Sequence, residues 1–125
     1  MITAAADGER SCATGTLTYV SLEPPLIATP LRPGSRTRRL AEASGEFSVS
    51  ILSEAQAELA VNPVSDVQDC AAVFRCTVES ADGPLLVGRV RDSVTTELAP
   101  LLRFRRRYRA LGRELDVAAE ADYQL

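Results

Sequence analysis

Apolar and polar residues alternate with a period of two along much of the chain, and this pattern predicts β-strands. The first clear run covers 16–22, where β-branched and aromatic residues dominate before a diproline ends it. A short apolar run at 26–29 predicts a second strand, and the prolines and glycine within 30–34 predict a loop after it.

Two short helices are predicted next to a third strand. Ser35 is the type of residue that caps a helix start, and Gly45 stands where a left-handed residue would end that helix. A strand is then predicted over 45–52, with its apolar residues on one face. After it, Ser53 and Gln56 have the spacing of a capping box, which predicts a second helix to about residue 60.

The second half of the sequence predicts a β-hairpin. The runs 73–80 and 85–97 are extended, and Asp82-Gly83 between them favours a tight turn. A last short strand is expected at 101–104. The buried face of the second run is expected to comprise Leu86, Gly88, Val90 and Val94.

About six strands with two short helices and no internal repeat predict an all-β fold, an antiparallel barrel. The length of 125 residues and the 46% hydrophobic content are those of one compact domain. We therefore predict a single domain over 1–125.

Composition removes several kinds of chemistry. The chain has no histidine, so an imidazole base and a histidine-ligated metal are excluded. All 14 cationic side chains are arginine, which excludes a lysine Schiff base. Cys12, Cys70 and Cys76 form no C-x-x-C pair, so they are expected to be reduced and mostly buried thiols. We assign no catalytic side chain and no metal site.

The charge balance bears on partners and location. The formal net charge is −3, which gives no general attraction to nucleic acid or to anionic lipid. No apolar run approaches the roughly 20 residues that a membrane helix needs, and the first residues do not look like a secretory signal. We expect a cytoplasmic protein that binds neither nucleic acid nor membrane.

Two arginine-rich stretches are candidates for anion binding. The segment 35–39 combines two hydroxyls and three guanidinium groups with the exposed amides of a helix start, an arrangement that suits a phosphate but is also common on solvated helix ends. The stretch 103–113 holds six arginines and no acid. We expect it to pair, within the chain or between subunits, with the acidic residues that follow, which are Glu114, Asp116, Glu120 and Asp122.

Five blocks in the same order resemble the flavin reductase-like family, whose members are split-barrel flavin-binding proteins. The main block, 13–26, is similar to the family's strand T-A-S-S-F-T-S-V-S-L-D-P-P-L. The other four blocks are 35–40, 44–56, 86–90 and 100–108.

The resemblance implies a six-stranded split barrel that forms a homodimer and binds FMN or FAD near the subunit interface. It implies an NAD(P)H-dependent flavin reductase, with NAD(P)H as co-substrate, that supplies reduced flavin to a two-component monooxygenase. By position, the residues flanking the flavin ring would be Thr14, Gly15, Thr16 and Leu17. Those holding the phosphate would be Arg32, Ser35, Arg36 and Thr37.

Three departures from the family pattern favour an alternative. The family's frequent Gly-Asp-His reads Ala81-Asp82-Gly83 here, the segment between Ala60 and Val73 is shorter, and Gly15 replaces a hydroxyl residue. The alternative is a shortened split barrel that has lost flavin reduction and serves a non-redox role in a biosynthetic pathway, or a flavin carrier.

Overall fold

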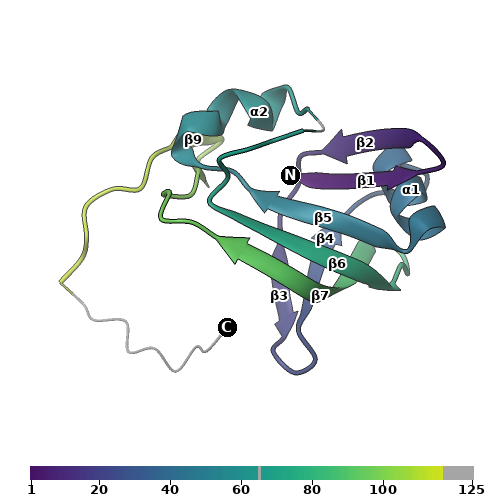
Figure 1. Ribbon diagram of the computed structural model, residues 1–125. Coiled ribbons are helices and arrows are strands. Elements are labelled where there is room, and N and C mark those ends of the chain that lie inside the picture. Colours follow the sequence, from purple (N-terminus) through teal and green to yellow (C-terminus); the bar gives the residue numbers. More distant parts are fainter. Residues whose placement is uncertain (65, 117–125) are drawn as a thin grey trace.

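The structure is a computed structural model that describes residues 1–64 and 66–116. Its regular elements are mostly β-strands, with short helices at two places (Figure 1). In chain order the elements are β1 (Ile2–Ala6), β2 (Glu9–Ala13), β3 (Thr18–Ser21), β4 (Leu26–Pro30), α1 (Arg36–Ser44), β5 (Glu46–Ile51), η1 (Glu54–Gln56), α2 (Ala57–Val61), β6 (Ala72–Ser80), β7 (Leu85–Thr95), β8 (Leu102–Phe104) and β9 (Arg107–Arg109).

Seven strands form one antiparallel sheet in the order β2-β1-β5-β6-β7-β4-β3, and β8 and β9 form a separate hairpin. The predicted fold class, an antiparallel split barrel with short helices, is confirmed, but the count of six strands was too low. The missed hairpin β1–β2 turns at Asp7 and Gly8, both with positive φ. Its first strand is mostly small residues, so it lacks the β-branched enrichment that marks the other strands.

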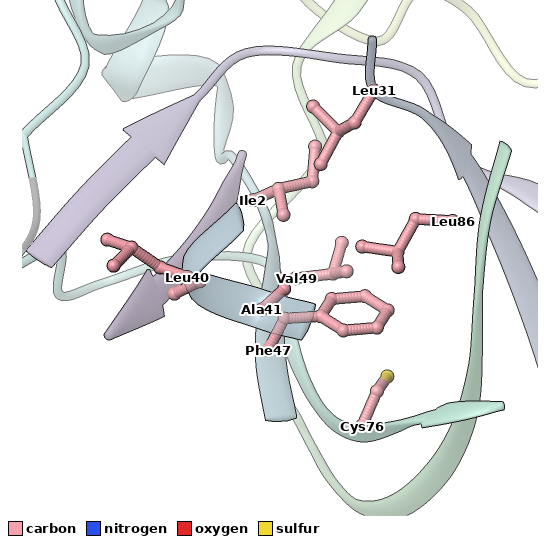
Figure 2. Close-up of a cluster of buried hydrophobic side chains, with 9 residues drawn as sticks. Ile2, Leu31, Leu40, Ala41, Phe47, Val49, Cys76 and Leu86 are labelled. Carbon is pink, nitrogen blue, oxygen red and sulfur yellow. The ribbon is translucent and has the colours of Figure 1, made fainter. Parts of the chain in front are cut away.

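The sheet curls around one apolar core, which Figure 2 shows in close-up. Ile2 of β1 and Leu86 of β7 belong to the same buried cluster, although β5 and β6 lie between their strands. Phe47 packs across to Gly88, where an added Cβ would lie 2.4 Å from the ring's Cζ. A glycine is therefore required at residue 88 because the ring occupies the space that a side chain would need.

One residue of the predicted buried face points the other way. Val94 is 58% exposed, whereas Leu86 is fully buried. The register between β6 and β7 shifts at Arg91, so that Cys76 pairs with Val90 but Arg75 pairs with Asp92. This bulge moves every later residue of β7 to the opposite face, because side chains alternate along a strand.

Helix α1 has the predicted caps. The Ser35 hydroxyl accepts a hydrogen bond from the Arg38 amide at 3.2 Å, and Gly45 adopts φ 76° at the C-terminal end. Glycine is favoured at that end because a left-handed residue there carries no Cβ strain. The helix packs against β1 and β2, as Figure 1 shows.

The second predicted helix begins at the expected capping box of Ser53 and Gln56 and continues as α2. A second apolar cluster lies beneath it, formed by Met1, Leu52, Ala60 and Cys70. Tyr108 of the β8–β9 hairpin packs against this cluster, which places the hairpin beside α2 (Figure 1). No helix among residues 1–64 and 66–116 has the length and apolarity of a membrane-crossing segment.

Candidate functional site

A cleft of about 410 Å³ opens between the start of β1, the end of β5, α2 and the β8–β9 hairpin. All four residues predicted to flank a flavin ring line it. Its lining comprises Met1, Ile2, Thr14, Gly15, Thr16, Leu17, Val49, Ser50, Ile51, Leu52, Ala60, Leu101, Arg103 and Tyr108. Such a mainly apolar wall with a few hydroxyls is typical of a site for a small, flat ligand.

The segment 14–17 joins β2 to β3 and is held from both sides. The Thr14 hydroxyl donates to the Ala60 carbonyl at 2.8 Å, and the Thr29 hydroxyl donates to the Thr16 carbonyl at 2.8 Å. Gly15 passes close to Ile2, since an added Cβ would lie 3.0 Å from its Cδ1. The segment therefore closes the barrel between β1 and β4 while leaving its own outer side exposed.

The four residues predicted to hold a phosphate lie at the start of α1, and none of them lines this cleft. Arg32 and Arg36 are exposed, and Arg36 lies 3.4 Å from Glu9 in a surface ion pair. Ser35 caps the helix and is half-buried. Thr37 is buried, and its hydroxyl lies 2.8 Å from that of Ser11. The structure thus brings together in a cleft the residues that were predicted to flank the ring, and leaves those predicted to hold the phosphate outside its lining.

Arg38, counted among the anion-binding guanidinium groups of 35–39, points into the protein instead. It is only 2% exposed. Its guanidinium donates to three backbone carbonyls, of Leu31 at 2.7 Å, Gly83 at 2.5 Å and Ala81 at 2.6 Å. It also pairs with Glu42 at 2.9 Å. Arg38 is a structural residue that ties α1 to the β6–β7 turn.

Sequence reasoning located only the segment 14–17 of the cleft, and the residues that it missed include Arg103 and Tyr108. They pair with each other across β8 and β9, and both line the cleft. The strand β9 was not predicted because it has only three residues within an arginine-rich stretch. The local signal was ambiguous, because the same arginine-rich stretch holds two aromatic residues and one of them, Phe104, is 55% exposed.

The expected pairing of the arginine stretch with the following acids is not seen where the structure describes it. Glu114 and Asp116 make no ion pair with any arginine of 103–113 among residues 1–64 and 66–116. Glu120 and Asp122 lie outside the described residues.

The other face of the sheet holds a larger, polar cleft of about 670 Å³. Hydroxyl, arginine and carboxylate side chains contribute to it, and the Arg10–Asp66 pair at 2.7 Å lies on its rim. Nearby, hydrogen bonding to Arg89 lowers the pKa of Glu79. None of the residues predicted to bind flavin lies there.

All three cysteines are free thiols, and Cys70 and Cys76 are buried, as predicted. Burial raises the pKa of Cys76 to about 11. This thiol therefore stays protonated at neutral pH and packs as an apolar residue within the core.

Residues 1–67 match the family described as flavin reductase like domain. A protein of Rhizobium meliloti (strain 1021) named "Probable flavin reductase" is 28% identical over 88% of this chain. That alignment covers 44% of the relative, so this chain spans less than half of its length. The 4-hydroxyphenylacetate 3-monooxygenase reductase component of Thermus thermophilus is 29% identical, covering 82% of this chain and 80% of the relative.

A solved structure agrees with these sequence matches. The styrene monooxygenase flavin reductase from Pseudomonas putida S12 superposes with a TM-score of 0.78 and 28% identity, covering 91% of this chain and 90% of that one. The family match itself spans 67 of the 125 residues. On these matches and on its split-barrel fold, the chain belongs to the flavin reductase-like domain family.

Proposed function

We propose that the protein is an NAD(P)H-dependent flavin reductase that supplies reduced FMN or FAD to a partner monooxygenase. The observation that carries this proposal is the 410 Å³ cleft, because the segment 14–17, where the family resemblance is strongest, forms one of its walls. The relatives whose names include a monooxygenase support the partner class.

The lining of the cleft fits a flavin ring. Leu17, Ile51 and Leu101, which are half-buried, supply apolar surface for the faces of the ring. The hydroxyls of Thr14 and Thr16 supply polar contacts for its edges. The cleft volume lies within the range of small-ligand sites, roughly 300–1,000 Å³. When bound, the flavin supplies the hydride-accepting chemistry.

The chain's own residues would position two rings rather than act as acid or base. Direct hydride transfer needs close stacking and exclusion of water, and no side-chain base acts on the transferred atom. Leu52, Ala60 and Tyr108 form the inner wall and would keep water from the ring. The absence of histidine from the sequence is therefore compatible with the reaction.

The phosphate of the flavin is assigned to the start of α1, with Arg36 and Ser35 as its main contacts. Both present polar groups to solvent, and the Ser35 hydroxyl accepts from Arg38, which leaves its own proton free to bind an anion. Arg32 completes this set by its positive charge. Thr37 is buried and belongs to the set only indirectly, through the contact between its hydroxyl and that of Ser11.

A homodimer is part of the proposal. The edge strand β3 exposes Tyr19 and Val20, at 60% and 47%, and Leu22 beyond it is 42% exposed. An exposed apolar edge strand invites pairing with another chain. Light scattering on the purified protein should give twice the chain mass of 13.4 kDa. We also place the protein in the cytoplasm, where NAD(P)H and the monooxygenase would be available.

The alternative function is a flavin carrier or a non-redox role. The specific observation is the turn Ala81-Asp82-Gly83, where the family often has a histidine. Two of its carbonyls are bound by Arg38, and none of its residues lines the cleft. In this alternative the cleft binds flavin but not nicotinamide.

Two measurements separate these functions. Quenching of flavin fluorescence reports binding, and absorbance of NADH or NADPH reports turnover with FMN or FAD. The reductase is supported when both occur, and when Tyr108→Ala weakens flavin binding about tenfold while Tyr108→Phe, which keeps the ring, does not. Binding without oxidation of NADH or NADPH favours the carrier, and the absence of both rejects flavin chemistry.

A further inference from the structure

The two faces of the β8–β9 hairpin differ in chemistry. Arg103 and Tyr108 pair across the two strands, and both line the cleft. Because side chains alternate along a strand, the neighbouring pairs lie on the opposite face. These pairs are Leu102 with Arg109 and Phe104 with Arg107. This second face, which we call the outer face, is directed away from the cleft.

The outer face has two exposed apolar side chains at its centre. Leu102 is 38% exposed and Phe104 is 55% exposed. They are two residues apart on β8, so their side chains are neighbours on the same face. Exposed apolar side chains that lie together are typical of a surface that another molecule covers.

Four arginines flank these apolar side chains. Arg107 and Arg109 are exposed on β9, and Arg105 and Arg106 are exposed at the tip of the hairpin. Within the part of the chain that the structure describes, none of the four forms an ion pair with a carboxylate. Because the whole chain carries a net charge of −3, the hairpin is a local region of positive potential on an acidic protein.

The placement of the arginines favours a protein partner over a nucleic acid. The guanidinium carbons of Arg105 and Arg109 lie 5.2 Å and 5.8 Å from the centre of the Phe104 ring. These two groups already lie over the ring, so a nucleic base could stack there only by displacing them. Their N–H donors point outward from the guanidinium edge, where a carboxylate can accept from them. Aromatic residues and arginine around an apolar centre are typical of protein interfaces.

We propose that the outer face of the β8–β9 hairpin, together with its tip arginines, docks an acidic surface of another protein. That surface would present carboxylates to the four arginines and an apolar side chain to Leu102 and Phe104. Since the inner face of the same hairpin lines the cleft, the partner would lie beside the candidate flavin site. The identification of this partner with the flavin-accepting monooxygenase rests on the proposed function, whereas the acidic docking surface does not.

Two fluorescein-labelled peptides of equal length serve as probes of an acidic partner. One repeats Glu-Glu-Leu and the other repeats Glu-Glu-Ser, so they carry the same charge and differ only in apolar contacts. Fluorescence anisotropy measures their affinities. We expect the leucine peptide to bind at least about tenfold more tightly than the serine peptide, and its binding to weaken as salt is added. Equal affinity for the two peptides would reduce the site to charge attraction and overturn the proposal.

The apolar centre is tested with Phe104→Ser, which keeps every charge. This variant should bind the leucine peptide about tenfold more weakly than wild type. Val94→Ser is the matched control, because Val94 is an apolar side chain of β7 with 58% exposure, and it should bind like wild type. Circular dichroism checks that both variants fold. Unchanged binding by Phe104→Ser would overturn the proposal.

The charges are tested with Arg105→Asn/Arg106→Gly. Both residues have positive φ, 50° and 65°, and Asn-Gly is the pair that such a turn favours, so the hairpin is retained while two charges are lost. The leucine peptide should bind this variant about tenfold more weakly. Arg75→Gln/Arg91→Gln is the matched control, which removes two exposed charges from β6 and β7. An equal loss in that control would indicate general attraction to the protein and overturn the proposal.

Two other occupants of the outer face have their own tests. A single-stranded RNA that binds more tightly than the leucine peptide, and is lost in the tip variant, would assign the face to nucleic acid instead. The competing occupant within the chain is the acidic stretch after the hairpin, which is neutralised by Glu114→Gln/Asp116→Asn/Glu120→Gln/Asp122→Asn. We expect this change to alter the peptide affinity by less than about threefold. A tightening of about tenfold or more would assign the face to the chain's own acidic residues.

Turnover of NADH or NADPH with free FMN or FAD separates this proposal from the proposed function. Phe104 does not line the cleft, so Phe104→Ser should leave turnover unchanged. Peptide binding that Phe104→Ser abolishes supports the docking surface even if the wild-type protein oxidises no NAD(P)H. Turnover by a wild-type protein that binds neither peptide supports the reductase and overturns the docking surface.

Discussion

Replacing Arg38 by methionine tests how α1 is fixed to the barrel. Methionine has a similar length and helix propensity, so the change removes mainly the guanidinium. Three carbonyls lose their donor, those of Leu31, Ala81 and Gly83. The bond to Leu31 is buried and the other two are partly buried, so water can replace some of the loss.

The expected magnitude follows from these burial classes. A buried acceptor left without a charged donor costs about 2–3 kcal/mol, and each partly buried one costs about 1 kcal/mol. The exposed end of the pair with Glu42 adds little. The sum is about 4–5 kcal/mol, a large share of the roughly 5–15 kcal/mol by which domains are usually stable.

Urea unfolding followed by far-ultraviolet circular dichroism measures this loss, since the chain has no tryptophan. Arg39→Met is the matched control, because Arg39 is the exposed neighbour on the same helix and should change stability by less than about 0.5 kcal/mol. Arg38→Lys keeps a charge with fewer donors and should lose about half as much, which covers the case in which Arg38→Met does not fold. A loss of less than about 1 kcal/mol for Arg38→Met would refute the structural role.

Three further predictions concern the core and the phosphate residues. Gly88→Ala should destabilise the protein by about 1–3 kcal/mol because its Cβ meets the Phe47 ring, whereas Gly112→Ala, with open space around it, should be neutral in the same urea experiment. The free energy of unfolding of wild type should exceed that of Cys76→Ala by an amount that falls by about 1.4 kcal/mol per pH unit between pH 9 and 11. The reason is that the Cys76 thiol ionises in this range in the unfolded chain, whereas in the folded protein its pKa is about 11. An advantage that stays constant across this pH range would contradict that pKa. Arg36→Gln should weaken FMN binding about tenfold and leave riboflavin binding unchanged in fluorescence titrations; equal effects on both flavins would place the phosphate elsewhere.

The elements that local patterns encode were predictable from the sequence. Ser35 and Gly45 bound α1, and the capping box at Ser53 starts the second helix, because caps act within a few residues. Strands rich in β-branched and aromatic residues, such as β6, were predicted because these residue types favour a strand wherever they occur in a short segment.

The parts set by tertiary packing were not predictable. The burial of Arg38 depends on carbonyls 43 and 45 residues away in the chain, and nothing in its own segment distinguishes it from the exposed Arg39. The exposure of Val94 depends on the bulge opposite Cys76, which requires the pairing of two strands. Strand β1 was missed because alanine supplies most of it.

In the candidate site, too, some residues could be predicted from the sequence and others depend on tertiary packing. The segment 14–17 was predicted from family resemblance to flank a flavin ring, and in the structure it lines a cleft. Arg103 and Tyr108 reach that cleft only because the hairpin folds back beside α2. Their role requires the long-range contact and cannot be derived from the local pattern.

Arg38 binds the β6–β7 turn through hydrogen bonds to main-chain oxygens only. These bonds therefore do not depend on which side chains the turn carries. An added Cβ at Gly83 would meet open space, and histidine is among the residues that tolerate its left-handed conformation, with φ 60°. Residues of this turn can therefore be replaced during evolution while the hydrogen bonds that hold α1 to it are kept. For the same reason, a histidine can be introduced at residue 83 when the barrel is redesigned.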